Sequence, residues 1–221
     1  MEDGTTRRRA PRLAALAAAL SLGISAAASA ADAQEGASAK RVRSILGLRH
    51  ERVAIQQWDL SCGAATVTTL LRYQFGDLAT KEEDVARSML ARTDSGLVRR
   101  RLGFTLLDLK RELVHRGYQA TGYGGVSLQD LLGMTPAIVR LQNPGFDHFV
   151  IVRGTAHGRI VMADPAYGNK TMSAERFMAV WKDKIAFTVS RPDGTRPKGQ
   201  LAIDPGEVPF VSPQALRTAL P

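Results

Sequence analysis

The spacing of apolar residues changes once along this chain, close to Pro136, and this change limits the folds open to it. Before Pro136, apolar residues recur every three or four positions, which is the period of an amphipathic helix. After it, short β-branched runs alternate with Pro, Gly and Asn turns, which is typical of strands. Helices first and an antiparallel meander second predict an α+β domain, with a helical N-terminal half and a C-terminal antiparallel sheet.

The predicted elements follow from these two patterns. Helices are expected over residues 62–75, 80–91, 105–116, 127–134 and 173–181. Strands are expected over 137–141, 148–152, 159–163 and 185–189. Thr80 with Glu83 matches a capping box at the start of the second helix. The sequence contains no internal repeat and no sign of a second domain.

The first 30 residues have the parts of a secretory signal peptide. Arg7, Arg8, Arg9 and Arg12 form a positive region, residues 13–28 are rich in alanine and leucine, and Ala28-Ser29-Ala30 supplies small residues for cleavage. We expect an exported, periplasmic protein, cleaved near Ala30, with no stable membrane span afterwards. The alternative is an uncleaved signal anchor, which the short, weakly apolar run disfavours.

Composition divides the rest of the chain into three segments. Residues 31–44 are polar and predict a spacer, and residues 45–190 predict the folded domain. Residues 191–221 are rich in Pro and Gly and predict a tail that is packed on the domain or partly disordered.

The charge of the chain is basic. Removing the first 30 residues takes away four Arg and two acids and leaves 26 basic and 19 acidic residues, about +7. Such a surface can attract nucleic acid, anionic lipid or an acidic polypeptide. No basic motif interleaved with aromatic residues is present, so ordinary solubility is favoured and no nucleic-acid partner is predicted. Arg99-Arg100-Arg101 is the tight basic cluster of the domain; we interpret it as a solvated loop, with an acidic substrate segment as the alternative.

Cys62 is the only cysteine, so it cannot form an internal disulfide. An odd thiol in an exported chain suggests intermolecular pairing or a reactive role. Cys62 opens a predicted helix, where the helix dipole favours a thiolate. Gln56, six residues earlier, is placed to donate its amide to a developing oxyanion beside the Cys62 N–H, and Gly63 allows close approach of a substrate. The pattern favours a nucleophile.

His148 is the best candidate for the base that a cysteine nucleophile needs, although a histidine opening an apolar strand is often structural. His50 and His115 lie in charged stretches and His157 in a turn. If residues 148–153 and 159–164 form a hairpin through a five-residue loop, His148 lies directly opposite Asp164 on one face. That is the pair of base and orienting carboxylate of nucleophilic catalysis. The alternative for Asp164-Pro165 is a simple turn.

Metal and cofactor chemistry have no support in the sequence. The single cysteine and the scattered histidines lack paired-ligand spacing such as CxxC or HExxH, so no metal site is predicted. No glycine-rich phosphate loop is present, because Gly124-Gly125 follows Tyr123 outside any strand-to-helix turn. We therefore predict no cofactor.

These residues resemble the papain-like cysteine peptidases that remove double-glycine leaders from bacteriocin and peptide precursors. The resemblance covers about residues 50–190 and rests on Gln56, on Cys62-Gly63 with Ala65, on His148-Phe149-Val150 and on Asp164-Pro165. It implies Gln56 as oxyanion donor, Cys62 as nucleophile, His148 as general base and acid, and Asp164 as orienter. Ser61 departs from the family pattern, in which an acid precedes the cysteine, and Phe75-Gly76 comes one residue later than usual.

A chain with a signal peptide and no transporter resembles the stand-alone exported members of this family, in particular the periplasmic one of functional-amyloid (Fap) secretion systems. The resemblance implies a periplasmic cysteine endopeptidase that cleaves an exported polypeptide, with outer-membrane secretion components as further partners. Two alternatives stay open: a non-catalytic docking or chaperone module, and an acyl transferase on the same Cys-His-Asp frame.

Overall fold

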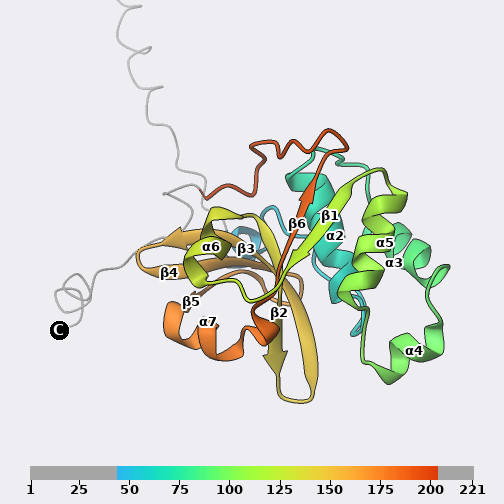
Figure 1. Ribbon diagram of the computed structural model, residues 1–221, viewed down its shortest axis with the longest axis horizontal. Helices are drawn as coiled ribbons and strands as arrows, with labels where there is room; N and C mark the ends of the chain where they lie inside the picture. The colour runs from blue at the N-terminus through green and yellow to red at the C-terminus, as the bar shows by residue number, and fades with distance from the viewer. Residues whose placement is uncertain (1–43, 204–221) are drawn as a thin grey trace, which may run out of the picture. The chain divides into compact units, whose positions relative to one another are not determined.

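The computed structural model describes residues 44–203, so the predicted signal peptide and nearly all of the predicted spacer lie outside it. The helices are α1 (Ile45–His50), α2 (Cys62–Tyr73), α3 (Glu82–Leu90), α4 (Ser95–Arg100), α5 (Leu106–His115), α6 (Leu128–Gly133) and α7 (Ala174–Val180), with a 3₁₀ turn over Lys182–Lys184 (Figure 1). The strands are β1 (Gln119–Tyr123), β2 (Ala137–Asn143), β3 (Phe146–Ala156), β4 (Arg159–Asp164), β5 (Gly168–Ser173) and β6 (Ala186–Ser190). The predicted α+β class is confirmed. None of the helices within 44–203 is long and apolar enough to span a bilayer.

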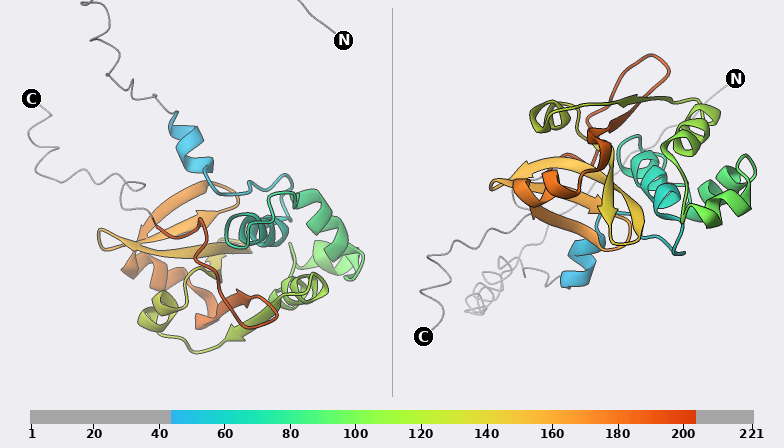
Figure 2. Two further views of the ribbon diagram at one scale, coloured as in Figure 1. Left: turned by 90° about the horizontal axis from the view of Figure 1, so that it is seen from above. Right: turned by 60° about the horizontal axis from the view of Figure 1, so that its bottom comes forward.

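A six-stranded antiparallel sheet separates two apolar cores. Its strand order is β1-β6-β2-β3-β4-β5. Alternate residues of β3 point to opposite faces: Phe149 and Ile151 join the core that contains α2, α3 and α5, whereas Val150 and Val152 join the core that contains α6 and α7. Helices therefore cover both faces of the sheet, as Figures 1 and 2 show. Burial on both faces explains why β3 is a continuous apolar run in the sequence.

Helix α2 lies at the centre of the first core and is buried from Cys62 to Leu71. A Cβ atom on Gly63 would lie 2.9 Å from Leu109 Cδ1 of α5 and 3.4 Å from Phe104 Cβ. The close approach at Gly63 is thus made by the neighbouring helix. The substrate contact that the sequence suggested for this glycine is wrong, because the position faces the core.

Four elements were not predicted, and each lacks a strong local signal. α1 has no buried residue, and α4 buries only Val98. β1 and β5 are the two edge strands of the sheet, and their exposed sides carry polar residues. Arg99 and Arg100 form the last turn of α4 and Arg101 its C-cap, so the cluster interpreted as a loop is helical.

The predicted capping box at Thr80 is also wrong. α3 begins at Glu82 with Lys81 as its N-cap, and no side chain caps it. The Thr80 hydroxyl donates instead to the carboxylate of Asp77. The first turn of α3 carries three acids, which stabilise it through the helix dipole without a cap.

Residues 191–203 return to the helical layer and pack on the domain. The Gln200 N–H donates to the Tyr73 carbonyl at 2.7 Å, at the end of α2, and Leu201 is fully buried in the first core. Buried Arg153 donates its Nε–H to the Leu201 carbonyl at 2.9 Å and an Nη2–H to the Ala202 carbonyl at 3.2 Å. This segment thus joins the end of α2 to the middle of β3. The rest of the predicted tail lies outside the described residues.

Candidate active site

Cys62 is the first residue of α2 and is 5% exposed. The loop before it is fixed by Ser61, whose hydroxyl donates to the Trp58 carbonyl at 2.8 Å and accepts from the Trp58 N–H at 3.2 Å. N–H groups in the first turn of a helix have no partner inside the helix, so the Cys62 N–H is available to an oxyanion. The Cys62 thiol thus lies at the N-terminus of α2, which is the positive end of the helix dipole.

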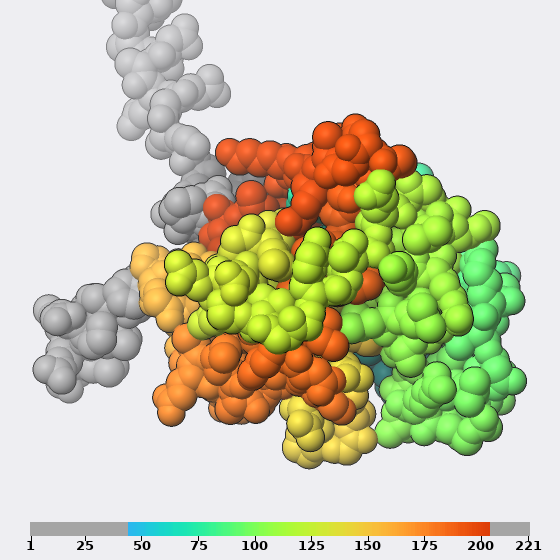
Figure 3. Space-filling model, viewed as in Figure 1, coloured from blue at the N-terminus to red at the C-terminus, as the bar shows by residue number. Residues whose placement is uncertain are grey.

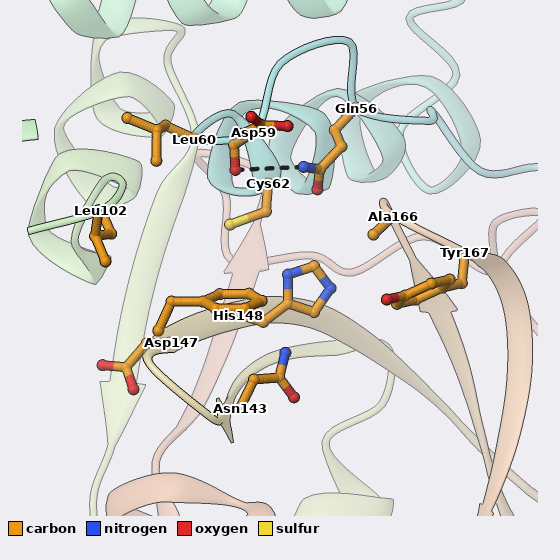
Figure 4. A pocket seen from close by; sticks show the side chains of 11 residues that line it. Gln56, Asp59, Leu60, Cys62, Leu102, Asn143, Asp147, His148, Ala166 and Tyr167 are labelled. Carbon is orange, nitrogen blue, oxygen red and sulfur yellow. Dashed lines mark hydrogen bonds between the residues drawn. The ribbon is translucent and has the colours of Figure 1, made fainter. Parts of the chain in front are cut away.

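His148 lies on β3 and forms a hydrogen bond to a buried carboxylate. Its Nε2 lies 2.7 Å from Asp164 Oδ1, and the two residues are 4% and 0% exposed. Asp164 Oδ1 also accepts the Ala166 N–H at 2.9 Å, which closes the turn at Pro165. Asp164 thus forms the turn and also contacts the histidine, while its orienting role stays a prediction. With Nε2 occupied, Nδ1 is left for Cys62, and Figure 4 shows the imidazole directly beside the thiol.

The predicted hairpin register is wrong, although the predicted contact forms. The loop between β3 and β4 has two residues, His157 and Gly158, both with positive φ, which is a type I′ turn. Ile151 pairs with Ala163, and a bulge between Val152 and Gly154 shifts the register. Continued by one pair, this register places Val150 opposite Asp164. The displacement from the prediction is two residues, so His148 and Asp164 keep the same face and meet diagonally.

The charges of the pair are tuned by their surroundings. Burial lowers the pKa of His148, but the hydrogen bonds and charges of Asp164 and Cys62 outweigh it and raise that pKa to about 9. Burial raises the pKa of Asp164, but His148 and Lys170 lower it below its ordinary value. His148 is therefore an imidazolium at neutral pH.

Gln56 is held on the other side of the thiol. Its backbone N–H donates to the Pro165 carbonyl at 2.8 Å, which joins this loop to the Asp164 turn. Its side-chain Nε2 donates to the Trp58 carbonyl at 3.1 Å and lies 3.5 Å from the Asp59 carbonyl (Figure 4). A charge-assisted hydrogen bond to an oxyanion is stronger than one to a neutral carbonyl. An oxyanion would therefore replace the Asp59 carbonyl, the more distant of the two acceptors of Gln56 Nε2.

A cavity of about 350 Å³ opens beside the thiol. Its lining includes Gln56, Cys62 and His148, together with Asp59, Leu60, Leu102, Asn143, Phe146, Asp147, Ala166 and Tyr167. Figure 3 shows the surface hollowed between the β2–β3 hairpin and the segment around α4. Asp147 is held by Lys182 at 2.9 Å and Arg140 at 3.2 Å. The mouth is apolar, since Leu102, Phe146 and Tyr167 are about half exposed or more.

The structure thus brings all four predicted site residues, Gln56, Cys62, His148 and Asp164, to one place, while their catalytic roles stay predictions. His50, His115 and His157 are exposed and lie outside the cavity lining. Within residues 44–203, no group of three His, Cys, Asp or Glu side chains is arranged to hold a metal ion.

Neither the apolar cavity walls nor Lys170, which contacts Asp164, could be identified from local sequence patterns. Leu102 follows α4 with a φ of 57°, and Phe146 begins β3. Their positions depend on turns that residue type does not specify. Lys170 lies in the polar edge strand β5, and only its pairing with β4 places it near the carboxylate.

Known proteins resemble this chain in sequence. The model of the Peptidase C39 family matches residues 50–193. A probable functional amyloid protease FapD of Pseudomonas fluorescens is 37% identical over 151 residues, and one of Pseudomonas aeruginosa is 35% identical over 150 residues. Each match covers 68% of this chain and 65% of the relative, so the chain matches just under two thirds of the relatives' length.

Solved structures share the fold. A double glycine motif protease from an AMS/PCAT transporter, in complex with the leader peptide, has a TM-score of 0.50 and 22% identity, over 66% of this chain and 91% of that one. The peptidase domain of Streptococcus ComA, a bifunctional ABC transporter, has a TM-score of 0.51 and 19% identity, over 64% and 99%. The likeness confirms the papain-like architecture. With the family model spanning almost the whole described domain, the chain belongs to the peptidase C39 family.

Proposed function

We propose that this chain is a cysteine peptidase, in which Cys62 is the nucleophile, His148 the general base and acid, Asp164 its orienter and Gln56 an oxyanion donor. The observation that carries the proposal is the continuous set of contacts from the start of α2 through the imidazole to a buried carboxylate, at the wall of an open cavity. Membership of the C39 family and the similarity to the FapD relatives support it.

The geometry gives each group one task. The Cys62 thiolate attacks the carbonyl carbon, and the oxyanion accepts hydrogen bonds from the backbone N–H of Cys62 and the side-chain amide of Gln56. As the C–N bond breaks, the imidazolium of His148 gives its proton to the leaving amine, and the acyl group stays on sulfur. His148 then takes a proton from water, and the hydroxide attacks the thioester carbonyl. The C–S bond breaks, the carboxylic acid leaves, and the thiolate and imidazolium are restored.

The proposed substrate is an exported polypeptide. The apolar mouth formed by Leu102, Phe146 and Tyr167 suits an extended chain with apolar side chains. The leader peptide bound in the related double glycine motif protease supports a scissile bond after small residues. The signal-peptide features of residues 1–30 support a periplasmic location, and the FapD names support a role in functional-amyloid secretion, with outer-membrane secretion components as partners to test.

The test uses synthetic peptides that carry Gly-Gly in an apolar context, matched to peptides with Val-Val instead. The purified full-length protein is incubated with each set in H₂¹⁸O, and the products are identified by mass spectrometry. We expect cleavage at discrete bonds with one ¹⁸O in the new carboxylate. Products without ¹⁸O, joined to an added amine, would identify a transferase. Intact peptides together with tight binding would identify a docking module and contradict the proposal.

Gln56→Ala is expected to lower kcat by about 10²–10³-fold with little change in KM, because the lost amide stabilises only the oxyanion. Steady-state kinetics on a cleaved peptide measure both constants. Gln57→Ala is the matched control, because the side chain of Gln57 is exposed and its backbone N–H, which the substitution retains, makes the contact to Glu82. Equal losses in the two variants would exclude Gln56 as the oxyanion donor.

A further inference from the structure

The second carboxylate oxygen of Asp164 has its own cation. Lys170 Nζ lies 2.5 Å from Asp164 Oδ2, whereas His148 and the Ala166 N–H occupy Oδ1. Lys170 lies on β5 opposite Met162, and Asp164 is paired with Gly168, so the two side chains are diagonal neighbours on one face. The Asp164 carboxylate is thus bridged between the imidazole and the ammonium group.

Lys170 is held at this place rather than extended into solvent. Its side chain is 26% exposed, and its Nζ lies 5.1 Å from the centre of the Tyr167 ring. Tyr167 in turn lines the cavity. A lysine with a fully buried carboxylate on one side and an aromatic ring on the other has little rotamer freedom, which is unlike an ordinary surface ion pair.

The charges of the site balance only when Lys170 is counted. In the proposed mechanism, the Cys62 thiolate and Asp164 carry two negative charges, and the His148 imidazolium supplies one positive charge. A buried site with an excess negative charge is costly, and it holds protons more tightly. The ammonium of Lys170 brings the formal charge of the resting site to zero.

Resting on the proposed function, we propose that Lys170 is a positioning residue that keeps Asp164 ionised and oriented while His148 is neutral. After the imidazolium has given its proton to the leaving amine, the carboxylate of Asp164 has lost its first cation. Lys170 is then the charge that keeps it a hydrogen-bond acceptor for Nε2–H. The tautomer with Nδ1 free to accept a proton from water is thereby maintained for the second half of the reaction.

Among residues 44–203, Asp59 and Asp147 line the cavity beside His148, and Asp147 is paired with Lys182 and Arg140. His148 comes from β3, Lys170 from β5 and Cys62 from α2. From α1, the ring of His50 passes the turn at Gly168, with Cδ2 3.1 Å from where a Cβ atom would stand, but His50 itself is exposed. Apart from His148 itself, Lys170 is therefore the cation whose removal changes the charge around Asp164 most directly.

The test follows the alkylation of Cys62 by iodoacetamide from pH 4 to 11, since the chain has no other thiol. The thiolate–imidazolium pair gives a first plateau, and loss of the imidazolium proton gives a second, faster one. In Lys170→Met the second step is expected about one pH unit higher, because without the cation the pair of His148 and Asp164 holds its proton longer. Lys170→Arg is expected to keep the wild-type profile.

The matched control is Lys182→Met, which removes a lysine from another aspartate beside the cavity, Asp147. In this variant, the second rise in the alkylation rate is expected at the same pH as in the wild type. An unshifted step in Lys170→Met, or an equal shift in Lys182→Met, would overturn the assignment. If thermal melting shows that Lys170→Met is not folded, the experiment is repeated with Lys170→Gln. Alkylation needs no substrate, so a protein that cleaves no peptide but shows the shift would refute the proposed function alone.

Discussion

Cys62→Ala is expected to lose peptide cleavage by about 10⁶-fold, to the limit of detection, because no acyl-enzyme can form without the sulfur. The fold is expected to be retained, since alanine is a good helix residue at the first position of α2. Mass spectrometry of the peptide mixture measures the loss, and the melting temperature reports the fold.

The control for this variant is wild-type protein blocked with iodoacetamide, which should lose the same activity. Cys62→Ser is a second control, because its hydroxyl has the right place but is not ionised. If Cys62→Ala keeps more than a hundredth of the wild-type rate, the thiol is not the nucleophile. Such a result would favour the alternative function, in which the cavity binds a polypeptide without cleaving it.

His148→Gln is expected to lower kcat/KM by about 10³–10⁴-fold, because the variant has no group that takes and returns the proton. In the wild type, activity is expected to fall with an alkaline limb near pH 9, where the imidazolium loses its proton. The pH profile of kcat/KM measures both effects. A variant with wild-type activity, or an alkaline limb near pH 6.5, would contradict the assignment.

The same histidine is expected to make stability depend on pH. Folding raises its pKa from 6.5 to about 9, so the folded state binds the proton more tightly than the unfolded chain. The stabilisation is complete below pH 6.5 and is lost as pH rises to about 9. Urea unfolding of the wild type and His148→Gln at pH 6 and 9 measures it. The difference in unfolding free energy should be larger at pH 6; an equal difference would contradict the raised pKa.

Much of the site could be predicted because its residues occupy positions that local patterns define. Cys62 opens a helix with clear periodicity, and His148 and Asp164 lie on two strands that a tight turn connects. The predicted register was wrong by two residues, yet the contact formed, since side chains of a strand alternate with a period of two. An error of one residue would have separated the pair.

The parts that could not be predicted depend on contacts between distant segments. The bulge beside Arg153 forms where its guanidinium reaches Asn169 and the carbonyls of Leu201 and Ala202. Strand β5 has few apolar residues, and it forms because its backbone pairs with the free edge of β4. Lys170 therefore had no local signal, and its place beside Asp164 follows from the pairing alone.

The anchorage of Arg153 has a consequence for the order in which the site is completed. Its guanidinium is buried in the strand that also carries His148, and it donates a hydrogen bond to the carbonyl of Leu201, 48 positions later. A buried cation without its acceptors is strongly unfavourable. When the chain is synthesised from its N-terminus, Cys62 appears early. The residues that complete the contacts of β3, which carries His148, appear much later. The strand that carries His148 therefore reaches its final packing only after the stretch around Leu201 has folded onto it.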